Sequence, residues 1–283
     1  MPYTSSSDGS RIYYERHGAG PAALLVHGSG GHHAAWWQQV PQLAAHYTVL
    51  TMDLRGFGRS DSGTDGDSGT CLAETDTVTI DSRAFPDDIL AVLDAADVGP
   101  AVLFGQSIGA AAALKAALRV PERAAGVVLG HSLGGIADEE LAALVRADRA
   151  EAEKLPVLDR LLTPAFRREQ PAKTFLFQQM GTFNTAKMAD LRNLSADGPT
   201  VADVLASGIP ICFLAGEKDA VLSADTVRAA AKRVTSSVLE LVPDAPHSMY
   251  WEAPELFNAA LERFLQQVFP AATSGTDSEA VNR

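Results

Sequence analysis

Short apolar runs alternate with helical patterns along most of the chain, and this alternation limits the possible folds more than any other feature. The runs have the length and the uniformly apolar character of strands buried on both faces. Because strands that alternate with helices form a parallel sheet covered by helices on both sides, we predict a three-layer α/β fold. The predicted strands are Ala22–Val26, Thr48–Met52, Ala101–Phe104, Gly126–Leu129, Ile209–Ala215 and Val238–Val242, and the predicted helices are Ala34–Ala45, Phe85–Ala96, Ala110–Arg119, Ala224–Lys232 and Glu255–Val268.

The alternation is absent at the start of the chain and in two internal segments. Asp8-Gly9 is a hairpin signal and predicts an antiparallel start that leads into Ile12–Arg16. Residues 61–79 are rich in Ser, Gly, Thr and Asp, which predicts a loop with one short strand near Thr77–Ile80. Residues 136–196 have helical patterns interrupted by Pro156, Pro164, Pro171 and Gly181.

The simplest interpretation of a helical segment inserted between two strands of a sheet is a lid that covers the edge of the sheet. We therefore expect residues 1–134 to form the first part of an α/β core, 135–199 to form a helical lid and 200–270 to complete the core. The polar segment 271–283 is expected to be a disordered tail.

Composition excludes several classes of function. A formal net charge of −12 would repel a phosphate backbone, so nucleic acid is not an expected partner. No apolar stretch reaches the roughly 20 residues of a membrane span, and the first residues have no signal-peptide pattern. Cys71 and Cys212 form neither a disulfide framework nor a metal-ligand spacing, so we expect a cytoplasmic protein with a small-molecule substrate and with no metal or cofactor.

One pentapeptide sits where a strand is followed at once by a helix. Gly105-Gln106-Ser107-Ile108-Gly109 follows the strand Ala101–Phe104 and opens the Ala-rich helix Ala110–Arg119. A nucleophile elbow requires this strand–turn–helix context, with small residues flanking a serine raised above the edge of the sheet. We therefore predict that Ser107 is the nucleophile.

A second pentapeptide matches the same pattern and must be weighed against the first. Gly130-His131-Ser132-Leu133-Gly134 also follows a strand, but the next helical pattern begins only after Gly135 and Ile136. Choosing Ser132 would leave the strand–helix unit around Ser107 unexplained. We interpret residues 130–135 as the hinge into the lid, with His131 near the pocket.

A serine nucleophile needs a base and an acid that orients the base. His247 lies in a turn after the last strand, and Asp219 lies in the loop after the strand Ile209–Ala215. Their order along the chain, serine, then aspartate, then histidine, is that of α/β-hydrolases. Asp138 and Asp244 are competing acids, and Asp244 is disfavoured because it shares a tight turn with His247.

Small residues also follow the first parallel strand, in His27-Gly28-Ser29-Gly30-Gly31. A backbone N–H in such a turn can face a developing oxyanion, so we expect Ser29 to supply one donor and Ile108 the second. A dinucleotide site is excluded because the third glycine is at the wrong spacing and no ribose-binding acid follows the next strand. In the predicted lid, Phe175, Phe177 and Met180 are expected to line an apolar pocket, together with His131.

The chain resembles the α/β-hydrolase superfamily in its lidded, single-domain form, and the resemblance extends over nearly all of residues 10–268. Gln106 departs from the family pattern, in which a histidine commonly precedes the nucleophile, and the loop 61–79 is longer than usual. The residues that carry the resemblance are His27-Gly28 with Trp36, Asp53-Leu-Arg-Gly-Phe-Gly-Arg-Ser60, the elbow at Ser107, Pro121-Glu-Arg, Gly216–Asp219, and His247 with Glu252-Ala-Pro-Glu-Leu-Phe257.

This resemblance implies a three-layer α/β-hydrolase sandwich, with a mostly parallel sheet, an antiparallel N-terminal hairpin and an inserted helical lid. It implies a serine hydrolase that cleaves an ester, lactone or thioester of a small, largely apolar substrate through an acyl-enzyme. The serine at the elbow argues against haloalkane dehalogenases and epoxide hydrolases, which have an aspartate there. Two alternatives stay open on the same fold: a C–C bond hydrolase or cofactor-free lyase, and a ligand receptor without catalysis.

Overall fold

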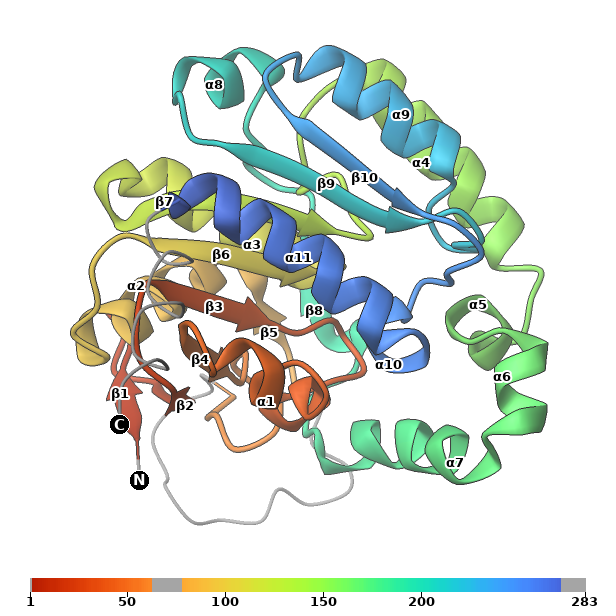
Figure 1. Ribbon diagram of the computed structural model, residues 1–283, viewed down its shortest axis with the longest axis horizontal. Coiled ribbons are helices and arrows are strands. Elements are labelled where there is room, and N and C mark those ends of the chain that lie inside the picture. The colour runs from red at the N-terminus through yellow and green to blue at the C-terminus, as the bar shows by residue number, and fades with distance from the viewer. Residues whose placement is uncertain (1, 63–77, 271–283) are drawn as a thin grey trace, which may run out of the picture.

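The computed structural model describes residues 2–62 and 78–270, and its centre is a mixed sheet of eight strands (Figure 1). The strand order is β1-β2-β4-β3-β6-β7-β9-β10, and every pair from β4 to β10 is parallel, whereas β2 is antiparallel to both of its neighbours. The strands are β1 (Tyr3–Ser5), β2 (Arg11–His17), β3 (Ala22–Val26), β4 (Thr48–Met52), β6 (Ala101–Gln106), β7 (Ala124–Gly130), β9 (Ile211–Gly216) and β10 (Val238–Val242).

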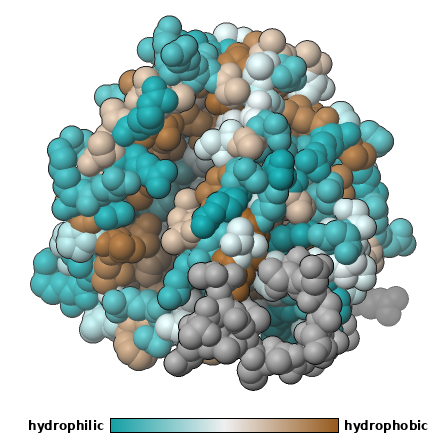
Figure 2. All heavy atoms as spheres, turned by 180° about the vertical axis from the view of Figure 1, so that it is seen from behind, coloured by the Kyte–Doolittle hydropathy of each residue, from teal (hydrophilic) through white to brown (hydrophobic). Residues whose placement is uncertain are grey.

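Helices cover both faces of this sheet, because alternate residues of each strand point to opposite sides. In β3, Leu24 and Val26 pack into one apolar core and Ala23 and Leu25 into the other. The first core is closed by α2 (Phe85–Ala95), α3 (Ile108–Arg119) and α9 (Ala224–Arg233), and the second by α1 (Val40–Leu43), α10 (Met249–Glu252) and α11 (Pro254–Val268). Seen from behind, the outer surface is mainly hydrophilic, with hydrophobic side chains scattered between (Figure 2). The predicted three-layer α/β fold is confirmed.

The antiparallel N-terminal hairpin is also confirmed. Tyr3 pairs with Tyr13 in the β1–β2 ladder, and Gly9 turns the chain with a φ of +88°. This value lies in the left-handed region that glycine enters without a steric penalty, which accounts for the Asp-Gly signal at this point.

Several predicted elements begin or end one or two residues away from their observed bounds, and three differences concern single segments in more detail. The helix expected over Ala34–Ala45 is in fact a 3₁₀ turn, η1 (His33–Trp36), followed by the short α1, because Pro41 has no N–H to continue a helical ladder. β9 begins at Ile211 because Pro210 cannot donate to the neighbouring strand. The strand expected near Thr77 is realised as β5 (Ile80–Asp81), although Thr77 itself lies outside the described residues.

The segment after β7 is helical, as its pattern indicates. Its helices are α4 (Glu139–Ala152), α5 (Val157–Leu161), α6 (Pro164–Glu169) and α7 (Pro171–Met180), and it is followed by β8 (Leu191–Arg192), which pairs with β5, and α8 (Val201–Ala206). α4 lies along α9, whereas α5, α6 and α7 lie toward the carboxyl ends of the strands (Figure 1). The tail expected at 271–283 lies outside the described residues.

Two sets of hydrogen bonds fasten this helical segment to the core. On one side, Ser248 N–H donates to Leu161 O at 3.0 Å, and Glu252 accepts from the backbone and side chain of Thr163 at 2.8 and 2.5 Å. On the other side, Asn184 donates to Gly31 O at 3.1 Å and accepts from Gly58 N–H at 2.9 Å. The helices that follow α4 are therefore anchored at both ends beside the carboxyl ends of the strands.

None of the helices within 2–62 and 78–270 combines the length and the apolar character that crossing a membrane requires.

Candidate active site

The topology brings two loops together at the carboxyl edge of the sheet. β3 lies between β4 and β6, so the chain leaves β3 in one direction to form β4 and returns on the other side as β6. A crevice forms at such a switch point, outside the carboxyl ends of the two strands. Val26 is paired with Gly105, so the loop after β3 and the turn after β6 begin side by side. A Cβ atom added to Gly28 would lie only 3.4 Å from Cβ of Ser107.

The turn at Ser107 is tight and strained. Ser107 has φ 53° and ψ −113°, and helix α3 begins at the next residue. A side chain on Gly105 would lie 2.3 Å from Gly109 O, and one on Gly109 would lie 2.7 Å from Val26 O, so both flanking positions require glycine. A non-glycine residue held at positive φ costs on the order of 1–3 kcal/mol and is characteristic of functional turns.

The competing turn at Ser132 lacks this geometry. Its helix, α4, begins only at Glu139 and is capped by Asp138, whose Oδ1 accepts from Leu141 N–H at 3.0 Å. Ser132 Oγ accepts from Gly134 N–H at 3.2 Å, which is a local turn contact. The two matching pentapeptides thus differ in structural context, because a helix directly follows Ser107 but not Ser132.

A cavity of about 480 Å³ opens in front of Ser107. Its lining comes on one side from the loop after β3, the turn after β6 and His247, Ser248 and Tyr250, and on the other from helices α5 and α7. The lining residues are Gly28, Ser29, Gly30, Gly31, Gln106, Ser107, Val157, Leu158, Leu161, Phe177, Gln178, Gly181, His247, Ser248 and Tyr250.

His247 reaches this cavity from the loop after β10 and contacts an acid behind it. Its Nδ1 donates to Oδ2 and Oδ1 of Asp219 at 2.9 and 3.0 Å, and its backbone oxygen accepts from Gln106 Nε2 at 3.1 Å. With Nδ1 engaged by the carboxylate, Nε2 is the nitrogen left for a proton on the cavity side. The structure thus brings Ser107 and His247 to one cavity and joins His247 to Asp219.

Asp219 is held in place by its own loop. Its side chain is fully buried, and Oδ1 also accepts from Val221 and Leu222 N–H at 2.8 and 3.0 Å. Burial alone would raise the pKa of this carboxyl, but the charges and hydrogen bonds of His247 and His131 bring the pKa of Asp219 well below its ordinary value. The group is a carboxylate throughout the neutral range.

The competing acids lie elsewhere. Asp138 pairs with Arg233 at 2.7 Å on the α4–α9 side of the molecule. Asp244 is at a φ of 60°, and its largely exposed carboxylate pairs with Lys218 at 2.5 Å. Neither carboxylate contacts His247, whose partner is Asp219.

The residues expected to hold an oxyanion are placed around Ser107. Ser29 lines the cavity in the loop Gly28–Gly31. Ile108 is the first residue of α3, where backbone N–H groups have no partner inside the helix and carry a partial positive charge. His27 orients this loop from below: Nδ1 donates to Gly28 O at 2.7 Å and Nε2 accepts from Leu54 N–H at 3.0 Å.

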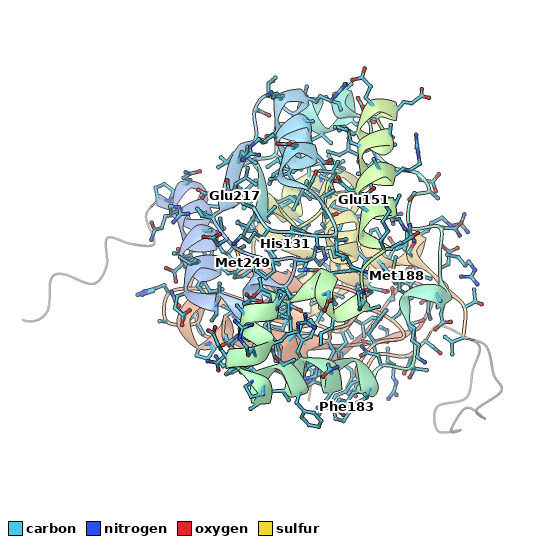
Figure 3. All side chains as sticks on the ribbon, turned by 90° about the vertical axis from the view of Figure 1, so that its right-hand side faces the viewer. His131, Glu151, Phe183, Met188, Glu217 and Met249 are labelled. Carbon is cyan, nitrogen blue, oxygen red and sulfur yellow. The ribbon has the colours of Figure 1, made fainter. Side chains whose placement is uncertain are left out.

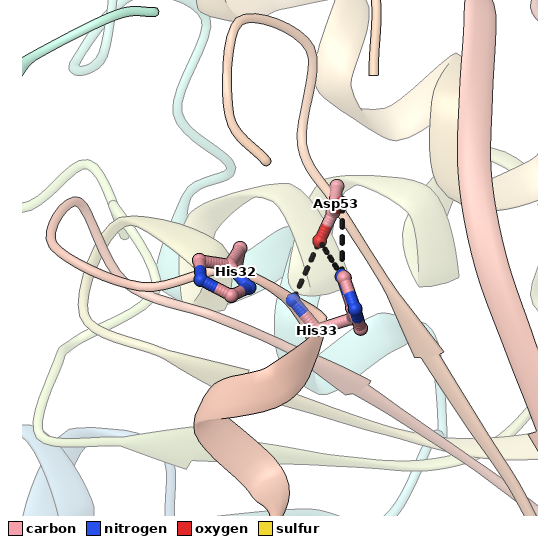
Figure 4. A group of neighbouring side chains, drawn as sticks. All are labelled: His32, His33 and Asp53. Carbon is pink, nitrogen blue, oxygen red and sulfur yellow. Dashed lines mark hydrogen bonds and ion pairs between the residues drawn. The ribbon is translucent and has the colours of Figure 1, made fainter. Parts of the chain in front are cut away.

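A second set of hydrogen bonds, accepted by Asp53 after β4, holds the loop after β3 in place (Figure 4). Asp53 Oδ1 accepts from the backbone N–H and the Nδ1 of His33 at 2.5 and 2.8 Å, and Oδ2 accepts from Arg59 N–H at 2.8 Å. His32, His33 and Asp53 have possible metal-ligand atoms within 4.8 Å of one another, but these hydrogen bonds already occupy both carboxylate oxygens. The cluster fixes the loop after β3 against the loop after β4.

The structure places the four expected pocket residues in different surroundings. Phe177 lines the cavity, but Phe175 is 63% exposed, because residues two apart on α7 point to nearly opposite sides of the helix. Met180 packs into the second apolar core and is not among the residues that line the cavity. His131 is not among the residues that line the cavity, and its Nδ1 donates to Oδ2 of Asp219 at 2.9 Å.

Several residues of the site have no signal in the sequence that distinguishes them. Tyr250 and Gln178 line the cavity from segments that sequence patterns identify only as helical. Gln106 stands out in the sequence as a departure from the family pattern, but its contact with the backbone of His247 depends on the fold. His131 is the second donor to Asp219, a role that requires two strands to lie side by side.

Comparisons with known proteins agree with this architecture. A family model described as the alpha/beta hydrolase family matches residues 23–260. The chain is 31% identical over 263 residues to the dihydrolipoyllysine-residue acetyltransferase component of the acetoin cleaving system of Pseudomonas putida, a match that covers 90% of this chain and 66% of that protein. Two further curated relatives are matched over 41% and 34% of their lengths, so all three extend beyond the matched region.

Two solved structures are similar over nearly their whole length. A thermophilic esterase from Thermogutta terrifontis has a TM-score of 0.75 and 25% identity, with 94% of this chain and 98% of that one covered. Est816, described as an N-acyl homoserine lactone degrading enzyme, has a TM-score of 0.71 and 25% identity, with 93% and 100% covered.

Proposed function

This chain belongs to the alpha/beta hydrolase family. On that premise we propose that it is a hydrolase that cleaves a small, uncharged carboxylic ester, lactone or thioester through an acyl-enzyme on Ser107. The observation that carries the proposal is the position of His247. This histidine lies between Asp219, which it contacts at 2.9 Å, and the cavity that Ser107 lines.

In the proposed reaction, Ser107 Oγ attacks the carbonyl carbon while His247 Nε2 takes the hydroxyl proton. The tetrahedral intermediate collapses to the acyl-enzyme, and His247 returns the proton to the departing alcohol or thiol. Water then attacks the acyl-enzyme with the same base, which releases the acid and restores Ser107. Asp219 holds the Nδ1–H tautomer of His247 and stabilises the imidazolium formed in each half of the cycle.

The backbone N–H groups of Ser29 and Ile108 are the proposed oxyanion donors. Their support is the close approach of the loop Gly28–Gly31 to Ser107 and the position of Ile108 at the start of α3. Loss of one such donor typically lowers the rate by about 10²- to 10³-fold.

The lining of the cavity supports an uncharged substrate. Helices α5 and α7, within the proposed lid of residues 135–199, supply Val157, Leu158, Leu161 and Phe177 as an apolar wall. The residues that line this cavity, all in the described part of the chain, include no Lys, Arg, Asp or Glu. An acyl group with its own carboxylate would lose hydration there without gaining a partner charge, whereas a short alkyl or aryl ester would bury apolar surface.

The proposal is tested with 4-nitrophenyl acetate, butyrate and octanoate under pre-steady-state conditions. We expect a burst of one 4-nitrophenolate per active site, and stoichiometric labelling of Ser107 by a fluorophosphonate, located by peptide mass spectrometry. Ser107→Ala should abolish both signals. Binding of these esters without turnover in the wild type would indicate a ligand receptor and contradict the proposal.

The charge preference has a separate test in a matched pair of substrates. The 4-nitrophenyl butyrate and the 4-nitrophenyl monoester of succinic acid have the same leaving group and the same number of acyl carbons, but only the second has a carboxylate. We expect kcat/KM for the charged ester to be lower by about tenfold or more. Equal values would show that the acyl group does not enter the apolar part of the cavity.

A further inference from the structure

The acid behind His247 has two imidazole partners instead of one. Oδ2 of Asp219 accepts from Nδ1 of His131 and from Nδ1 of His247, both at 2.9 Å, and the two rings are 5.3 Å apart between centroids. The side chains of His131 and Asp219 are fully buried. In Figure 3, which looks at the carboxyl ends of the strands, His131 lies near the centre of the molecule, whereas Phe183 projects from its edge.

The contact with a carboxylate defines the tautomer of His131. A carboxylate only accepts, so Nδ1 of His131 must have the proton. Its Nε2 is buried and has no hydrogen-bond partner among the described residues, so a second proton there would have no acceptor. Burial, opposed by the hydrogen bond and the charge of Asp219, lowers the pKa of His131 below its ordinary value. His131 is thus a neutral donor.

The backbone fixes His131 in this orientation. It is the first residue after β7 and has a φ of 52°, a left-handed value that is uncommon outside glycine. Its N–H donates to Leu214 O at 2.8 Å, which continues the ladder between β7 and β9. The loop after β9 contains Asp219, so the two side chains meet at the ends of neighbouring strands.

The other charged groups near Asp219 are directed away from it. Lys218 pairs with Asp244, and Glu217 pairs with Arg228 at 3.2 Å, both at the surface. From α4, Asp148 accepts from Ser223 N–H at 2.8 Å. Tyr250 on α10 is buried, and burial raises its pKa, so it stays neutral. The groups whose charge acts on His131 are Asp219 and His247.

We propose that His131 is a positioning residue for the reaction: by donating from Nδ1 to Oδ2 of Asp219, it fixes the plane of the carboxylate and shares its negative charge between two imidazoles. The proposal rests on the proposed function, in which Asp219 serves His247. His131 does not line the cavity and does not touch the substrate. It acts through Asp219.

This role has a directional consequence. Without the donor of His131, the full charge of Asp219 acts on His247 and favours its protonated form, which cannot accept the proton of Ser107. The acid limb of the kcat/KM–pH profile should therefore move to higher pH. Looser orientation of the carboxylate should lower kcat by about tenfold, the order expected for losing one hydrogen bond to a buried charge, and should change KM little.

Two substitutions separate hydrogen bonding from packing. His131→Phe keeps a planar ring and removes the donor, whereas His131→Asn loses the ring and keeps a donor, because its side-chain nitrogen occupies nearly the position of Nδ1. We expect the shifted acid limb and the lower kcat in His131→Phe, and a profile close to that of the wild type in His131→Asn. Thermal unfolding of both variants identifies any general loss of fold, and Ser132→Ala is the control at the neighbouring position.

The opposite result would be a wild-type pH profile in His131→Phe and an impaired His131→Asn. It would show that His131 only fills space and would overturn the proposal. A readout independent of turnover is the ¹⁵N NMR spectrum of the histidine rings, in which we expect His131 as the neutral Nδ1–H tautomer at pH 7. A protonated or Nε2–H ring would also overturn it. If Ser107→Ala remained active or Ser107 could not be labelled, the proposed function would fail instead, whatever the NMR spectrum of His131.

Discussion

His247 directs its Nδ1 at both oxygens of Asp219, at 2.9 and 3.0 Å, and lines the same cavity as Ser107. The contact joins the loop after β9 to the loop after β10, two neighbouring parallel strands. It also leaves two other candidate acids, Asp138 and Asp244, in ion pairs of their own. This arrangement leads to predictions in which each variant has a matched control.

Asp219→Asn should preserve the fold and lower kcat by about 10⁴-fold, the size of the effect of the same change in serine proteases, because the amide favours the wrong tautomer of the histidine. Asp138→Asn and Asp244→Asn should each cost about tenfold or less, since their carboxylates pair with Arg233 and Lys218 outside the site. Steady-state kinetics with 4-nitrophenyl butyrate provides the measurement. A nearly active Asp219→Asn beside an inactive Asp138→Asn would move the acid to the segment after β7.

Ser107→Ala should abolish turnover without loss of structure, whereas Ser132→Ala should keep at least about a tenth of the activity. The reason is that only Ser107, of the two, lines the cavity and directly precedes a helix in the described structure. Circular dichroism checks the fold of both variants. Fluorophosphonate labelling of Ser132 would show that the nucleophile has been misassigned.

Phe177→Ala should change the ratio of kcat/KM for octanoate over acetate esters by about tenfold, because its ring is part of the apolar wall of the cavity. Phe175→Ala is the matched control on the same helix, since its ring is 63% exposed and away from the cavity. Equal effects of the two substitutions would show that the ring of Phe177 contributes only to the packing of α7.

The stability of the protein should fall as the pH is lowered below about 6.5. Burial lowers the pKa of His27 from 6.5 to about 4, so the unfolded chain takes up a proton in this range before the folded one does. Neutral His27 therefore contributes roughly 3 kcal/mol to the free energy of unfolding at pH values above its ordinary pKa. This contribution is lost as the pH falls toward about 4, and below that pH no more of it is lost.

Urea unfolding at pH 7.5 and 4.5 measures this loss. In His27→Gln, the difference in the free energy of unfolding between pH 7.5 and pH 4.5 should shrink by most of that amount. Substitution of the exposed His46 by Gln should leave this difference unchanged. An unaltered pH dependence in His27→Gln would assign the acid sensitivity to other groups.

The strands and the elbow could be predicted because their signals are local. β3, β4 and β10 have the predicted bounds, since an apolar run between turn residues suffices to define a buried strand. The strand–helix context of Ser107 is likewise contained in about twenty residues. Asp219 and His247 could be chosen because each follows a strand whose carboxyl end faces the same edge.

The remaining features depend on contacts between distant segments. Asp219 and His131 are 88 positions apart and meet because β7 and β9 are neighbours in the sheet. The sequence places Phe175 and Phe177 on one helix, but it does not specify the rotation of α7 about its axis, which decides which ring faces the cavity. That rotation is set by contacts such as the bond from Trp251 Nε1 to Lys173 O at 3.2 Å.

The hydrogen bonds that join α5 and α6 to the segment after His247 have a consequence for altering the proposed activity by mutation and selection. Leu161 lines the cavity and accepts a hydrogen bond from Ser248, the residue that follows the proposed base. A mutation that moves α5, and with it the proposed acyl-binding wall, should therefore also shift the backbone next to His247. Gains in selectivity obtained there should be accompanied by losses in turnover.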